Sequence, residues 1–129
     1  SMLGPTMCLD PLEGFRPLLV AERELLQRLL SADFEGAQGL SRQLRGTVVQ
    51  SIDHNGSLRI RPLDATPVLV ARRIPVEASY ADAEGVTVHV LVHVIGGLLQ
   101  ELEVFREDSG DVMVAPARAS RLDIEAWVE

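Results

Sequence analysis

Hydrophobic positions follow a helical period early in the chain and a period of two after Gly46. Four leucines between Leu25 and Leu30 occupy one face of a helix, and charged residues occupy the other face. This spacing predicts an amphipathic helix after Leu18. A second, shorter helix is expected over Phe34 to Leu44, where two glycines reduce the helix propensity.

Tripeptides that end in Gly separate the alternating segments, and each suits a three-residue hairpin loop with Gly in the left-handed conformation. In the loop that ends at Gly97, this geometry pairs Val90 with Leu102 and makes one face of the hairpin apolar. A two-residue turn would instead bury the carboxylates of Glu101 and Glu103, at a cost of several kcal/mol. The four tripeptides are His54–Gly56, Ala83–Gly85, Ile95–Gly97 and Asp108–Gly110.

The same loop rule predicts that one apolar face extends across four adjacent strands. We therefore expect an α+β fold, with two N-terminal helices packed on an antiparallel β-meander of about five to six strands. Residues 1–17 are expected to be an irregular lead-in, and residues 18–129 a single domain. Pro62 to Pro75 is a candidate for a further strand, and Ser120 to Val128 is a candidate for a short docking helix. The pairs that the rule predicts are Tyr80–Val88, Ala78–Val90, Val76–Val92, Val104–Val114 and Ile52–Leu58.

Composition narrows the functional classes. The chain of 129 residues has a net charge of -7, and all 12 of its basic residues are Arg. Acidic chains repel phosphate backbones, which disfavours nucleic-acid binding. The Arg bias predicts a GC-rich bacterial genome. A lone Cys8, the lack of an evident signal peptide and the lack of a membrane-spanning apolar run predict a cytoplasmic protein with no membrane association.

The outer face of the predicted sheet holds the candidate functional residues. His89 and His93 lie about 13 Å apart along one strand, so they cannot share one metal ion. We therefore expect no metal and no cofactor, and no nucleophile or catalytic pair stands out from the sequence. The alternative is a metal-binding or ligand-binding site made of His89, Glu103 and Glu77. The predicted outer face consists of Glu77, His89, Leu91, His93, Leu99, Glu101, Glu103, Phe105 and Met113.

Large apolar side chains lie among the charged residues of this face. An apolar patch with a polar rim is typical of contact with another protein or with a second copy. We therefore expect a non-enzymatic bacterial interaction protein, of an immunity-like or mobile-cassette kind, that forms a homodimer or binds another protein. The alternative is a small enzyme or ligand-binding protein with a His/Glu site on the same face.

Several motifs share their order with a known group of domains. The Leu-rich first helix is followed by a D-x-x-G turn at Asp82 to Gly85, an alternating Val strand and the sequence GLLQELE from Gly97 to Glu103. In this order the chain resembles, over Phe15 to Pro116, a group of small uncharacterised bacterial domains of unknown function. The resemblance implies no activity and assigns no functional residue.

Overall fold

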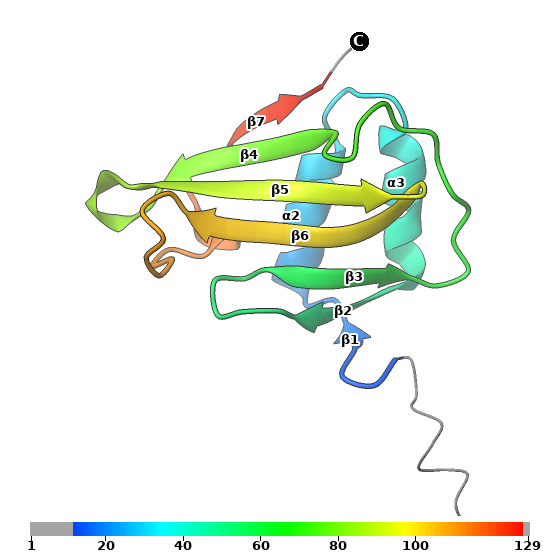
Figure 1. The fold of residues 1–129 in the computed structure, drawn as a ribbon, viewed down its shortest axis with the longest axis horizontal. Helices are drawn as coiled ribbons and strands as arrows, with labels where there is room; N and C mark the ends of the chain where they lie inside the picture. The colour runs from blue at the N-terminus through cyan, green and yellow to red at the C-terminus, as the bar shows by residue number, and fades with distance from the viewer. Residues whose placement is uncertain (1–11, 128–129) are drawn as a thin grey trace, which may run out of the picture.

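The computed structural model describes residues 12–127 and has an α+β fold, as predicted. Its sheet has seven strands instead of the expected five to six, in the order β1-β2-β3-β6-β5-β4-β7, and every pairing is antiparallel (Figure 1). The helices are α2 (Val20–Leu30) and α3 (Ala37–Gln43). The strands are β1 (Arg16–Pro17), β2 (Thr47–Ser51), β3 (Leu58–Pro62), β4 (Val76–Ala81), β5 (Thr87–Ile95), β6 (Leu98–Arg106) and β7 (Asp123–Ala126).

Helix α2 has Leu19, and not Ser, Thr, Asp or Asn, at its N-cap position. The carboxylate of Glu22, three residues later, binds the backbone at this end of the helix instead. Glu22 accepts the backbone N–H of Leu19 at 2.8 Å. Its two carboxylate oxygens also accept hydrogen bonds from Arg16 of β1, each at 2.8 Å. The Arg16 hydrogen bonds lower the pKa of the Glu22 carboxyl. Glu22 therefore joins the start of α2 to the first strand of the sheet.

One hydrophobic core contains side chains from both helices and from strands β2, β3, β4, β5 and β6. Figure 1 shows α2 and α3 behind the sheet, and no helix in front of β4, β5 and β6 among the residues drawn in colour. The alternating burial of β5 follows from this arrangement, because every second side chain faces the core. The largest fully buried side chains of the core are Leu26, Leu29, Leu30, Leu40, Leu44, Val49, Val76, Val88, Val90, Val92, Leu99 and Leu102.

The β4–β5 hairpin has the predicted register. Tyr80 pairs with Val88, Ala78 with Val90, and Val76 with Val92. Its loop has a φ of 68° at Glu84 and 78° at Gly85, so two residues, and not Gly alone, adopt the left-handed conformation.

The β5–β6 hairpin differs from the prediction in its turn. Gly96 and Gly97 form a two-residue turn with φ values of 60° and 79°, where three residues were expected. Gln100 is then an extra residue in β6, because the register shifts by one at this point. This β-bulge places Val92 opposite Leu102, so the hairpin keeps its apolar face without burying a carboxylate.

Two other predicted pairings are wrong. The β2–β3 hairpin pairs Ser51, and not Ile52, with Leu58. The residues around Val114 form no strand, and β6 pairs with β3 on that side. The physical reason is that Asp82 and Tyr80 bind the backbone of the Val114 segment and hold it away from β6.

Two segments also differ from the secondary structure predicted for them. The C-terminal tail forms strand β7 beside β4 and not a helix, although its Leu122 is buried as expected. The stretch from Pro62 to Pro75 supplies no strand after Pro62. The lead-in ends in β1, whose two residues pair with β2.

The segment of residues 63–74, called the strap here, packs on α3 and on the β5–β6 turn. Val68 donates its backbone N–H to Gly97 at 2.9 Å. A Cβ atom on Gly39 would lie 2.6 Å from the Val68 side chain, and one on Gly97 would lie 2.6 Å from the Val68 backbone. The strap can approach this closely only because glycines stand at these two positions.

Candidate functional site

The register places seven of the nine predicted residues on the uncovered side of the sheet. We call these seven residues the outer face. They alternate with the buried residues of β4, β5 and β6, and most are partly exposed. The outer face consists of Glu77, His89, Leu91, His93, Glu101, Glu103 and Phe105.

The other two predicted residues lie elsewhere. Leu99 is only 1% exposed and belongs to the core. It precedes the bulge at Gln100, so its side chain points to the side opposite to the one that a regular strand would give. Met113 lies in the loop after β6, where its backbone N–H donates to Asp82 at 2.9 Å.

His93 is the centre of a short hydrogen-bonded chain on this face. Its Nε2 lies 2.8 Å from Glu103 Oε1, and Arg73 Nε donates to its Nδ1 at 3.5 Å. Because Arg73 can only donate, Nδ1 is the acceptor and Nε2 carries the proton that is donated to Glu103. No local sequence pattern links Arg73 to this face, since it lies in the strap and reaches β5 only through the fold.

The same arrangement bears on metal binding. Ligand atoms of His93, Glu101 and Glu103 lie within 4.8 Å of one another. A metal on His93 Nε2 would leave the proton on Nδ1, where it would meet the N–H of Arg73. The predicted alternative trio of His89, Glu103 and Glu77 is not assembled, because Glu103 pairs with His93 and His89 pairs with Glu107 at 3.1 Å. The geometry therefore favours a hydrogen-bonded chain over a metal centre.

His89 and Phe105 form the apolar part of the outer face. Their rings stack with centroids 5.0 Å apart and an interplanar angle of 23°. They are direct cross-strand partners, whereas the predicted register placed Glu103 opposite His89. Phe105 is still 38% exposed, and Leu91 lies beside the pair on the same side of β5. The stack therefore presents an aromatic surface that no part of the described chain covers.

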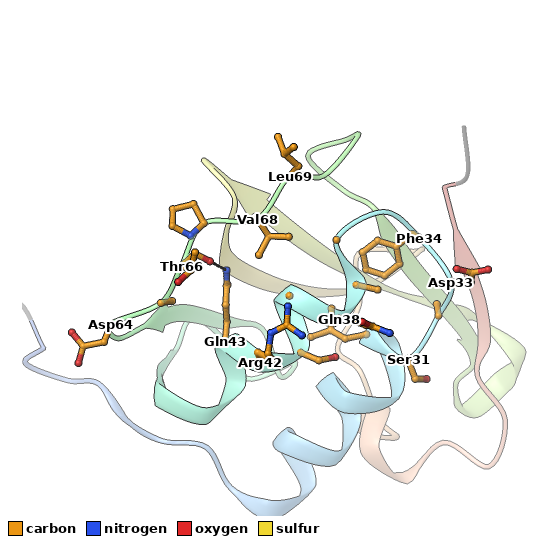
Figure 2. A pocket seen from close by; sticks show the side chains of 18 residues that line it. Ser31, Asp33, Phe34, Gln38, Arg42, Gln43, Asp64, Thr66, Val68 and Leu69 are labelled. Atoms are coloured by element: carbon orange, nitrogen blue, oxygen red, sulfur yellow. Dashed lines mark hydrogen bonds between the residues drawn. The ribbon is translucent and has the colours of Figure 1, made fainter.

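Three hollows in the described part of the chain lie away from the outer face. A broad hollow of about 1250 Å³ lies along α3, between the loop at Phe34 and the strap (Figure 2). Two smaller hollows lie along the strap and between α2 and Pro116. None of these three is lined by a residue of the outer face. These three hollows, which have the concave shape of a small-ligand site, are therefore separate from the outer face.

A buried charged cluster that the sequence analysis missed explains the D-x-x-G turn. The Asp82 side chain is fully buried and accepts the backbone N–H groups of Met113 at 2.9 Å and Val114 at 2.7 Å. The Met113 hydrogen bond is the main cause that lowers the pKa of the Asp82 carboxyl. Arg106 lies 3.6 Å from Asp82 and pairs with Glu84 at 2.9 Å. The motif therefore has a structural role in holding the loop after β6.

Replacing Asp82 with Asn should destabilise the domain most at neutral pH. The lowered pKa means that ionised Asp82 stabilises the fold above its unfolded-state pKa, and that this contribution is lost as the pH falls through the lower folded-state value. Urea unfolding of both proteins should give a difference in stability at neutral pH that shrinks in acid, below about pH 4. An equal difference at both pH values would show that the charge of Asp82 does not matter.

Comparison with known proteins identifies a family but no activity. No helix in the described part of the chain has the length and apolar character of a membrane span. No curated protein and no solved structure matches the chain. A family model matches residues 15–116, which is the stretch over which the resemblance was expected. The chain therefore belongs to the family described as Domain of unknown function (DUF6984).

Proposed function

We propose that this domain is a non-enzymatic interaction protein that binds a protein partner through its outer face. The observation that supports the proposal most directly is the stacked pair of His89 and Phe105, which lies on the uncovered side of a broad sheet. Leu91 extends the apolar centre, and Glu101 and Glu103 form a polar rim beside it. A central aromatic anchor with a polar surround is the usual anatomy of a protein–protein interface.

The competing hypothesis is that the domain is an enzyme or a small-ligand-binding protein that uses His93 and Glu103. The imidazole and the carboxylate are already hydrogen-bonded to each other, and Arg73 occupies the remaining ring nitrogen. Of the hollows described above, the one along the strap includes Arg73, but none includes His93 or Glu103, so a small ligand would have few walls around it at the imidazole. A flat partner surface suits the face better.

Affinity capture from cells of the source organism tests the proposal. Partners captured by the parent protein should be lost with Phe105→Asp and with Leu91→Asp, because each change places a charge at the apolar centre. The matched control is Leu69→Asp, since Leu69 is 83% exposed but lies in the strap. Capture that is unchanged by both outer-face variants, or lost equally with Leu69→Asp, would contradict the proposal.

A further inference from the structure

Unpaired charges of opposite sign lie on the two sides of the outer face. On one side, Arg59 of β3 is exposed and lies across from Glu101 in the register, but its guanidinium donates to the amide oxygen of Gln50 at 2.8 Å and forms no ion pair among the described residues. On the other side, Glu77 of β4 lies directly opposite Glu125 of β7. Like charges at such positions destabilise a sheet, and no cation pairs with either carboxylate within residues 12–127. Neither Arg59 nor these two carboxylates therefore forms an ion pair within the described residues.

The order of the strands makes this pattern self-complementary for one symmetry axis. In a dimer with two sheets face to face, the two-fold axis lies in the plane of the interface. An axis that runs along the strands, between β5 and β6, places β3 of one copy over β4 of the other. Arg59 is level with His93 in the register, so it then lies about two residues, roughly 7 Å, from the level of Glu77 and Glu125, which its long side chain can span. An axis across the strands would instead place β3 over β3 and Arg59 over its own equivalent.

We infer that the partner of the outer face is a second copy of this chain, docked face to face about a two-fold axis along β5 and β6. This inference rests on the proposed interaction function and adds the partner and the geometry. The same axis places β6 over the partner's β5, so that Phe105 meets the partner copy's His89. The apolar centre and both charged sides thus acquire partners in one arrangement.

The dimensions of the face are adequate for such a dimer. Strands lie about 4.8 Å apart, so the five adjacent strands β3, β6, β5, β4 and β7 give a width of roughly 24 Å. A strand rises about 3.3 Å per residue, so the length of β5 gives the face a height of roughly 30 Å. This projected area of about 700 Å² is close to the ~800 Å² that each partner contributes to a typical stable interface. Two twisted sheets stacked with nearly aligned strands also pack well.

Charge reversal with mixing tests the inference. Sedimentation velocity of the parent protein at tens of micromolar, a range suited to weak interfaces, should show a dimer. Arg59→Glu alone and Glu77→Arg alone should each weaken the dimer by about tenfold or more, because each variant sets like charges against each other twice. An equimolar mixture of the two variants should recover dimers, since both contacts in the mixed dimer join opposite charges. Arg28→Glu on α2, away from the sheet, is the matched control and should leave the mass unchanged.

The outcomes separate this inference from the proposed function. A monomeric parent protein, or variants that dimerise like the parent and gain nothing on mixing, would overturn the homodimer. The proposed function would then still stand if Phe105→Asp abolished the capture of a different protein. Stronger dimerisation of an Arg59→Ala variant would indicate the axis across the strands, because the change would remove two like charges that face each other, and it would overturn the geometry. Circular dichroism of each variant establishes that it is folded.

Discussion

Val90→Asp should unfold the domain, whereas His89→Asp should leave it folded. Val90 is 0% exposed, and its direct cross-strand partners are Ala78 and Val104. A carboxylate at this position would be desolvated without a hydrogen-bond donor or a cation, at a cost of several kcal/mol. Domains of this size have a stability of only about 5–15 kcal/mol, so the loss approaches the whole free energy of unfolding.

The adjacent residue is a matched control on the same strand. His89 points to the outer face, where its ring stacks on Phe105 and its Nε2 lies 3.1 Å from Glu107. His89→Asp removes this stack and places a carboxylate near Glu107, so it should weaken the proposed dimer while costing little stability. Urea unfolding of both variants beside the parent measures the difference. Equal losses would mean that both sides of the sheet are buried, and the reverse order would mean that β5 is rotated by one residue.

Most of the outer face could be predicted from the sequence, although the predicted length of the β5–β6 loop was wrong. The predicted register paired Val90 with Leu102, and the structure pairs it with Val104. A slip of two residues leaves every side chain on the same face, because alternation in a strand has a period of two. Glu103 and Phe105 therefore lie on the predicted side. Leu99 does not, because only residues beyond the bulge at Gln100 share the predicted alternation.

Pairings between distant segments could not be predicted in the same way. Hairpin loops report only on neighbouring strands, but β3 pairs with β6 and β4 pairs with β7. The two tail residues Asp123 and Glu125 lie on the outer side of the sheet because β7 pairs with β4. Arg73 contacts His93 because the strap passes beside β5. The charge pattern of the outer face therefore depends on contacts that no local sequence pattern contains.

Gln43→Leu should destabilise the domain and loosen the strap. The Gln43 side chain lies buried beneath the strap, where its Nε2 donates to Gly97 O at 2.9 Å and to Thr66 O at 3.1 Å (Figure 2). Its Oε1 accepts the backbone N–H of Leu99 at 3.0 Å. The one amide thus joins α3, the strap and the start of β6, and all three contacts are to backbone atoms.

Leu has nearly the volume of Gln but cannot form these bonds. Gly97 O retains the N–H of Val68, and Thr66 is exposed to water, but the buried N–H of Leu99 is left without an acceptor. An unsatisfied buried donor costs about 1–3 kcal/mol, which urea unfolding can resolve.

Hydrogen exchange locates the effect of Gln43→Leu. The Leu99 amide and the Val68 amide, whose acceptor Gly97 O depends on the same anchor, should exchange faster, while amides at the centre of β5 should lose protection only in proportion to the global change. Gln38→Leu is the matched control, because Gln38 lies on the same helix but is exposed in the hollow of Figure 2. If Gln43→Leu were as stable as Gln38→Leu and left the Leu99 amide protected, the glycine contacts with Val68 would have to hold the strap by themselves.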